Sequence, residues 1–196
     1  MFLTQNLKKT KQNGSQQINK KKAIFLDRDG ILNESIVVNG KPLSPRKISE
    51  VLIPNGIDKK LLEFKKKEYL LVCVTNQPDV ARGTIDMNDV DKLNNFLKNR
   101  LSIDYFYVCP HDDNDYCGCR KPKSGNLIQA AKDHNIDLTK SFIVGDRWKD
   151  IAAGKAVNCK TAFVDYNYNE KKPYKYDFYA LTPSHVMEKI LNFING

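Results

Sequence analysis

Two carboxylates lie one residue apart in the segment Asp27-Arg28-Asp29-Gly30, directly after an apolar run at residues 23–26. A short apolar run of this kind predicts a buried strand, and open α/β sheets bind their ligands beyond the C-terminal ends of the strands. Two acids in that place favour a hard cation such as Mg²⁺, which takes oxygen ligands. The alternative is a plain turn, because Asp-Gly is also a hairpin signal.

Polar residues end the other apolar runs as well. They are Thr75-Asn76-Gln77 after residues 70–74, Cys109 after residues 103–108, and Asp146 after residues 142–144. The C-terminal ends of parallel strands meet at one edge of a sheet, so we expect these side chains to converge although they are far apart in the sequence. Such convergence argues against the turn-only interpretation of the two acids.

The elements that must position these residues alternate along the chain. Apolar spacing predicts strands near 23–26, 70–74, 103–108, 142–144, 161–164 and 178–181, and helices from about 54, near 85–101, 125–135 and 149–157, and after Thr182. This order indicates right-handed crossovers and a three-layer, Rossmann-like α/β fold with a mainly parallel sheet. Residues 31–53 contain Gly40, Pro42 and Pro45, which favour a hairpin or flap over the end of the first strand.

This set of residues suits the hydrolysis of a phosphate monoester. Asp27 can attack phosphorus to form an acyl-phosphate, and Asp29 can protonate the leaving oxygen and later activate water. The carboxylate of Asp27, the backbone carbonyl of Asp29 and the carboxylate of Asp146 offer oxygen ligands to Mg²⁺. Asp150, four residues after Asp146, is a candidate for an additional or outer-shell acid.

Other residues can bind the phosphoryl group. Thr75 and Asn76 offer a hydroxyl and an amide to its oxygens, and either Arg120 or Lys121 offers the cation that offsets charge in the transition state. Gln77 is a further substrate-binding candidate beside them.

Three of the five cysteines cluster between residues 109 and 119. Cys109, His111, Cys117 and Cys119 supply three thiolates and an imidazole, which is the ligand set of a closed, structural Zn²⁺ site. The alternative is a loop with free thiols and a histidine. A zinc ion here would fix the loop that carries Arg120 and Lys121.

The segments FLDRDGILN, VTNQ, CRKP and GDRWKD, in this order and spacing, resemble the four motifs of the haloacid dehalogenase superfamily of phosphatases over residues 23–181. Within it the chain resembles the compact, capless branch of heptose-bisphosphate and histidinol-phosphate phosphatases, which also carry a zinc loop. The resemblance implies Mg²⁺ dependence and an aspartyl-phosphate intermediate. By matching position it makes Asp27 the nucleophile, Asp29 the acid/base, Thr75 and Asn76 phosphate ligands, Lys121 the charge-neutralising lysine and Asp146 a metal ligand.

The resemblance favours a sugar-phosphate substrate, with a heptose 1,7-bisphosphate 7-phosphatase of cell-envelope polysaccharide synthesis first and a histidinol-phosphate phosphatase second. Arg82 and Arg120 favour the heptose side, because either can bind a second phosphate or the polyol. The stretch between His111 and Cys117 is shorter than is typical of heptose enzymes, which leaves the sugar open.

The charge is distributed unevenly along the chain. The net charge is +9, but residues 1–22 hold six lysines and no acids, so the remainder carries only +3. We expect residues 1–22 to be a disordered basic tail and 23–196 to be the phosphatase domain. The small remaining charge argues against a polynucleotide 3′-phosphatase or a nucleic-acid-binding module. We expect a cytoplasmic monomer with no membrane or specific nucleic-acid partner.

Overall fold

The computed structural model describes residues 19–196. Its main sheet has six strands in the order β5-β4-β1-β6-β7-β8, and every neighbouring pair is parallel. The strands are β1 (Lys22–Leu26), β4 (Tyr69–Asn76), β5 (Tyr105–Cys109), β6 (Phe142–Gly145), β7 (Lys160–Val164) and β8 (Phe178–Ala180). The predicted α/β class and parallel sheet are confirmed.

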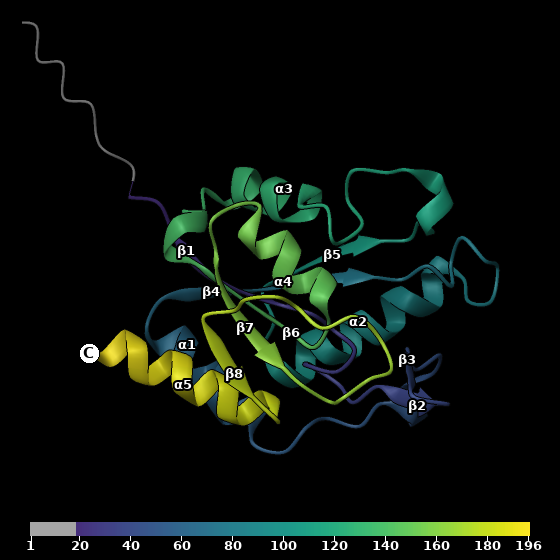
Figure 1. The fold of residues 1–196 in the computed structure, drawn as a ribbon, viewed down its shortest axis with the longest axis horizontal. Helices are drawn as coiled ribbons and strands as arrows, with labels where there is room; N and C mark the ends of the chain where they lie inside the picture. The colour runs from purple at the N-terminus through teal and green to yellow at the C-terminus, as the bar shows by residue number, and fades with distance from the viewer. Residues whose placement is uncertain (1–18) are drawn as a thin grey trace, which may run out of the picture.

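Helices cover both faces of the sheet (Figure 1). They are α1 (Ile57–Lys66), α2 (Met87–Leu101), α3 (Gly125–His134), α4 (Trp148–Lys155) and α5 (Pro183–Asn195), with short 3₁₀ turns at Ile48–Glu50, Asp113–Asp115 and Leu138–Lys140. One apolar core joins α1, α2 and α5 to the sheet, and a second core joins α3 and α4 to its other face. The fold therefore has the three layers that the alternation of elements predicts.

Strand β1 lies inside the sheet, between β4 and β6. Ala23, Ile24, Phe25 and Leu26 are all fully buried, because a parallel strand covered on both faces has no wet side. The chain order reverses at the β1–β6 boundary, since β4 and β5 extend the sheet to one side and β7 and β8 extend it to the other. Such a switch point is where open α/β sheets bind ligands, and Asp27 and Asp146 follow the two strands that flank it.

The predicted flap is a two-stranded antiparallel hairpin, β2 (Ile36–Val38) and β3 (Lys41–Leu43). Its turn is Asn39-Gly40, and both residues have positive φ, 51° and 74°. This conformation is typical of the two-residue hairpin turn, which Asn-Gly adopts with little strain. Between residues 19 and 196 the sheet carries this hairpin and the loop of residues 109–120, and it carries no inserted cap domain.

Most of the predicted tail, residues 1–18, lies outside the described residues. Residues 19–22 are described: the backbone N–H of Lys21 donates to the carbonyl of Asn135, and β1 begins at Lys22. The chain leaves α5 on the left of Figure 1, where β1 also begins, and β2 and β3 lie on the right. In this described part of the chain, no helix has the length and apolar character needed to cross a membrane.

Candidate active site

Three carboxylates and one ammonium group meet at the C-terminal edge of the sheet. Asp27 follows β1, Asp146 follows β6, and Asp150 lies in the first turn of α4; one oxygen of each lies within 4.8 Å of the others. The Nζ of Lys121 lies 2.9 Å from Asp27 Oδ1 and also pairs with Asp150. The structure thus brings together the predicted nucleophile, metal ligand and lysine.

The electrostatics of this cluster favour a divalent cation. Three carboxylates against one ammonium leave a formal excess of two negative charges. Burial, with Lys121 opposing it and Asp150 and Asp29 adding to it, raises the pKa of Asp27 to about 6. Burial and the charges of Asp27 and Asp150 likewise raise the pKa of Asp146. A Mg²⁺ ion among these oxygens would remove that repulsion.

The surroundings of the Asp146 carboxylate also favour a bound cation. Both of its carboxylate oxygens are buried and have no hydrogen-bond partner among residues 19–196, which is costly unless a cation ligates them. Gly30 leaves room for this carboxylate, because a Cβ built there would lie 2.0 Å from Asp146 Oδ2. Gly30 also has φ +92°, a conformation that glycine adopts without strain. These residues fit the predicted Mg²⁺ site.

Asp29 is held differently from its neighbour Asp27. Its carboxylate accepts hydrogen bonds from the guanidinium of Arg28, from Asn33 Nδ2 (3.0 Å), from Ser44 Oγ (2.7 Å) and from Gln77 Nε2 (2.8 Å). Burial acts to raise the pKa of Asp29, but Arg28 and these hydrogen bonds outweigh it and lower the pKa below its usual range. The two acids of the motif therefore have opposite pKa shifts.

The three polar residues at the end of β4 have separate surroundings. Thr75 is buried and its hydroxyl accepts a hydrogen bond from Gln77 Nε2 at 2.8 Å. Gln77 is also buried and faces Thr75 and Asp29. The Asn76 side chain brackets the backbone of Lys121, because its Nδ2 donates to the Lys121 carbonyl and its Oδ1 accepts from the Lys121 N–H, both at 3.0 Å. Asn76 thus helps to place the lysine.

The four predicted zinc ligands lie together in the loop of residues 109–120, which we call the Cys/His loop. Cys109 Sγ lies 3.6 Å from Cys117 Sγ and from His111 Nδ1, and Cys119 Sγ lies 3.4 Å from Cys117 Sγ and 3.3 Å from His111 Nδ1. Two sulfurs on one tetrahedral zinc ion, each about 2.3 Å from the metal, lie about 3.8 Å apart. The spacing of the four atoms fits one shared zinc ion.

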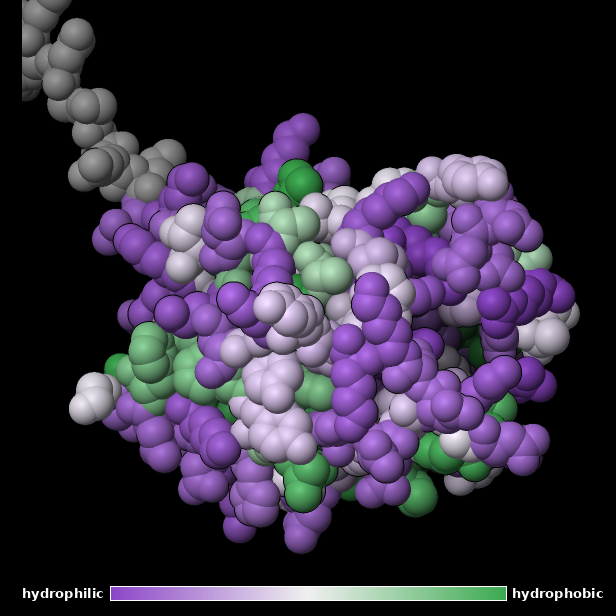
Figure 2. Space-filling view, in the orientation of Figure 1, coloured by the Kyte–Doolittle hydropathy of each residue, from purple (hydrophilic) through white to green (hydrophobic). Residues whose placement is uncertain are grey.

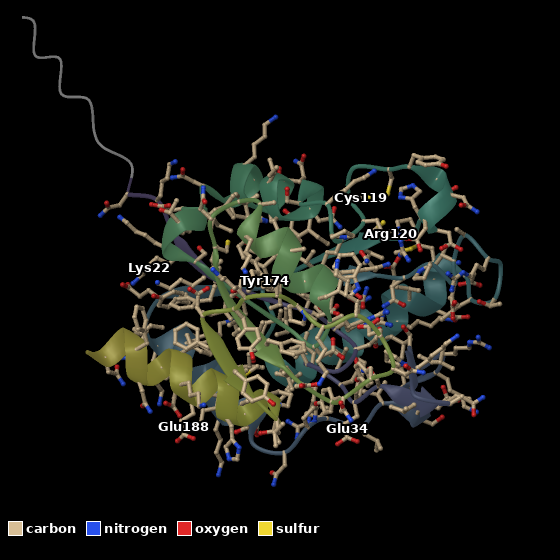
Figure 3. All side chains as sticks on the ribbon, in the orientation of Figure 1. Lys22, Glu34, Cys119, Arg120, Tyr174 and Glu188 are labelled. Atoms are coloured by element: carbon tan, nitrogen blue, oxygen red, sulfur yellow. The ribbon has the colours of Figure 1, made fainter. Side chains whose placement is uncertain are left out.

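The Cys/His loop ends directly at the two cations of the site. Figure 3 shows Cys119 and Arg120 beside each other, near the end of β5. The next residue, Lys121, turns inward, and its Nζ also donates to the Val74 carbonyl. A metal that fixed the loop would therefore also fix the position of the buried lysine.

A second hollow adjoins the catalytic cavity. The catalytic cavity measures about 60 Å³, and the neighbouring hollow measures about 330 Å³. The two share residues of the hairpin, Asn76, Arg147 and Lys149. Five cationic side chains and three acids line the hollow of about 330 Å³, which we call the basic hollow. The cations are Lys41, Arg82, Arg120, Arg147 and Lys149, and the acids are Asp79, Asp113 and Glu170. Hydrophilic side chains surround a depression on the right of Figure 2, on the side where Figure 1 places β3.

The two predicted substrate-binding arginines both line this hollow, and both are paired. Arg82 donates to Asp112 at 2.7 and 2.9 Å, and Arg120 Nε donates to Asp113 at 2.7 Å. Arg120 is 9% exposed, and its buried Nη1 has no partner among the described residues. Arg120 therefore has a free donor to offer to an anion.

A third hollow, of about 770 Å³, lies between the hairpin and the start of α5. Ser35 lines both this hollow and the catalytic cavity. The hollow lacks the three clustered carboxylates and Lys121, so the smaller cavity is the candidate active site.

Several residues of the site were not predicted from the sequence. Arg28 is fully buried beside Asp29, Ser44 reaches Asp29 from the hairpin, and Arg147 pairs with Glu170 through both Nε and Nη2. A charged residue between the two acids of the motif was the one available signal for Arg28. Ser44 and Glu170 lie in irregular segments, and the sequence pattern there does not predict which side chains face the site.

Comparisons with known proteins agree with this geometry. The family model of HAD-hydrolase-like proteins matches residues 118–193. The heptose-1,7-bisphosphate 7-phosphatase of Haemophilus ducreyi, named for the β-anomer, is 39% identical over 153 residues, which cover 72% of this chain and 81% of the relative. The Campylobacter jejuni enzyme, named for the α-anomer, is 35% identical over 179 residues, covering 89% of this chain and 96% of the relative.

A solved structure shares the fold. The D,D-heptose 1,7-bisphosphate phosphatase from B. bronchiseptica, crystallised with magnesium and phosphate, has a TM-score of 0.72 at 24% identity, covering 88% of this chain and 99% of that one. The resemblance found in the motifs is therefore confirmed by sequence relatives and by fold. The chain belongs to the haloacid dehalogenase superfamily of phosphatases and, within it, to the family of the heptose-bisphosphate 7-phosphatases.

Proposed function

We propose that this protein removes the 7-phosphate of a D-glycero-D-manno-heptose 1,7-bisphosphate in the synthesis of cell-envelope polysaccharide precursors. The observation that carries the proposal is the basic hollow of about 330 Å³ beside the carboxylate cluster. A monophosphate needs one anion site, and the cluster with Lys121 provides it. The hollow beside it offers cationic side chains to a second phosphate on the same sugar.

Asp27 and Asp29 perform the chemistry in this proposal. Asp27 attacks phosphorus, and the bond to the sugar oxygen breaks. Asp29 takes up a proton before this step, because its donors hold its pKa low, and gives that proton to the leaving oxygen. Asp29 then takes a proton from water as the water attacks the aspartyl-phosphate. Lys121 holds positive charge beside the phosphoryl oxygens and keeps Asp27 oriented. Mg²⁺, held by the carboxylates of Asp27 and Asp146 and by the Asp29 carbonyl, would stabilise the charge that develops on those oxygens.

The substrate proposal is tested by measuring phosphate release from a panel of sugar phosphates with Mg²⁺. The panel contains both anomers of heptose 1,7-bisphosphate, heptose 7-phosphate, a hexose bisphosphate and histidinol phosphate. We expect the highest kcat/KM for one anomer of the heptose bisphosphate. A flat panel, or a preference for histidinol phosphate, would reject the proposed substrate.

The role of the basic hollow is tested by Arg120→Gln. A hydrogen bond to a charged group contributes about 1.5–3 kcal/mol, so we expect kcat/KM for the bisphosphate to fall by roughly 10- to 100-fold. The value for heptose 7-phosphate should change far less, because it lacks the second phosphate. Arg100→Gln, which changes an exposed arginine at the end of α2, is the matched control. Equal losses on both substrates would contradict the assignment.

We also propose that the Cys/His loop binds a structural Zn²⁺ through Cys109, His111, Cys117 and Cys119. Cys117→Ser should lose the metal and most activity, although the thiolate touches no substrate, because the loop no longer fixes Lys121. Metal analysis and phosphate release measure the two effects. Cys159→Ser, which changes a buried thiol outside the loop, is the control. The zinc assignment fails if the purified native protein contains no zinc.

The remaining expectations stay predictions from the sequence. They are a cytoplasmic location, a monomeric state and the absence of a specific nucleic-acid partner.

A further inference from the structure

The side chain between the two acids of the first motif lies in an unusual place for an arginine. Arg28 is 0% exposed and is the largest of the fully buried side chains in the part of the chain that the structure describes. A buried guanidinium is costly unless its donors are paired. The hydrogen-bond partners of Arg28 therefore indicate its role.

The described partners of the Arg28 side chain are two. Its Nε and Nη2 form a fork on the Asp29 carboxylate, with Nε to Oδ1 and Nη2 to Oδ2 both at 3.2 Å. Its Nη1 donates to Asn94 Oδ1 at 3.1 Å. Asn94 lies on α2 and is 5% exposed, so a rigid helix holds the far side of the guanidinium.

We propose that Arg28 is a positioning residue for Asp29, and that Asn94 anchors it to α2. A two-pronged fork fixes the plane of a carboxylate as well as its distance. Rotating Asp29 out of that plane would leave a buried guanidinium without its partner, so the carboxylate has one preferred orientation. A buried series of hydrogen bonds thus connects Asn94 on α2, through Arg28, to the Asp29 carboxylate that transfers the proton.

The other donors to Asp29 each contact only one oxygen of its carboxylate, so none of them fixes the plane of the group alone. Ser44 reaches it from the end of the hairpin, whose strands β2 and β3 have largely exposed side chains. Asn33 and Gln77 each contribute a single hydrogen bond. Arg28 is the residue that contacts both oxygens of the carboxylate.

This inference rests on the proposed phosphatase chemistry, in which Asp29 protonates the leaving oxygen and later activates water. The first role matters for a sugar alkoxide, which is a poor leaving group, and matters little for p-nitrophenolate, which leaves without a proton. The second role matters for both esters, because both form the same aspartyl-phosphate. Misplacing Asp29 therefore slows both steps with the sugar ester, and with p-nitrophenyl phosphate it slows only the hydrolysis of the aspartyl-phosphate.

The test compares heptose bisphosphate with p-nitrophenyl phosphate in Arg28→Lys, which keeps the charge and removes the fork. Positioned proton transfer contributes about 10²- to 10⁴-fold, so we expect kcat for the sugar ester to fall by about 100-fold without a rise in KM. With p-nitrophenyl phosphate, rapid mixing should show a stoichiometric burst of nitrophenolate at the wild-type rate, followed by slow turnover. A merely structural defect would slow the burst as well.

Variants of Asn94 test the same inference if Arg28→Lys does not fold. Asn94→Leu removes the acceptor at similar volume and should show the same pattern with a smaller loss. Asn94→Asp retains an acceptor oxygen and should restore the steady-state turnover of both esters. Asn95→Leu, at the exposed next position of α2, should behave as wild type.

Two results would overturn the inference: folded variants with wild-type kcat on the sugar ester, or a burst rate that falls in parallel with that kcat. Failure of the proposed function looks different. If the wild type rejects heptose bisphosphate, the substrate is wrong, and the comparison is made with whichever alkyl phosphate of the panel it cleaves. If Asp27→Asn still turns over every ester, the catalytic assignment itself is wrong.

Discussion

Asp27→Asn should abolish phosphate release while the protein remains folded. The amide occupies the volume of the carboxylate but cannot attack phosphorus, so we expect kcat to fall by at least about 10⁴-fold, as for other removed nucleophiles. The fold should not suffer, because burial and the neighbouring acids raise the pKa of Asp27 to about 6 and already disfavour its charge. Phosphate release and thermal unfolding measure the two outcomes.

The control for this variant is Asp91→Asn, which changes an exposed acid on α2 and should keep full activity. Turnover of Asp27→Asn near the wild-type rate would show that another residue is the nucleophile. A large drop in thermal stability would show that Asp27 is needed for the fold, and the activity loss would then have a second cause.

Lys121→Met should reduce both activity and stability. The lysine is 2% exposed and pairs with Asp27 and Asp150, which is itself 1% exposed. Breaking a buried ion pair on one side costs about 3–5 kcal/mol, because the remaining charge stays buried without its partner. Activity should fall by about 10²- to 10³-fold, since the transition state loses its fixed positive charge. Urea unfolding and phosphate release measure these effects.

A double variant separates the two effects of this lysine. Lys121→Met combined with Asp150→Asn removes one of the stranded charges, so the free energy of unfolding should recover in part. Activity should not recover, because no cation returns to the site. Recovery of activity in the double variant would show that Lys121 serves to neutralise Asp150 and has no direct part in catalysis.

The edge of the sheet where the site lies could be predicted from the sequence. Asp27, Asp146 and Cys109 each follow a short apolar run, and parallel strands must bring their C-terminal ends together. The Cys/His cluster was predictable for a similar reason, because its four ligands lie within one short loop. In both cases local patterns and one topological rule were sufficient.

The contacts across loops could not be predicted in this way. Gln77 directly follows β4, where a side chain that faces the phosphate was expected, yet it donates to Asp29 and Thr75 inside the protein. Ser44 reaches Asp29 from the end of a hairpin whose position depends on tertiary packing. Arginine is a residue type that is usually exposed, and the burial of Arg28 depends on Asp29 beside it and on Asn94, a partner 66 positions away. Such contacts join residues far apart in the sequence, and the hydrophobic periodicity of helices and strands does not predict them.

The course of the first strand and the last helix has a practical consequence. Strand β1 begins at the edge of the sheet opposite the carboxylates, and α5 runs back toward that same edge, so the described chain enters and leaves the fold there (Figure 1). The hairpin and the Cys/His loop stand at the other edge. The enzyme can therefore be tethered to a surface or fused to a second protein through the end of α5, while its active site remains accessible to solvent.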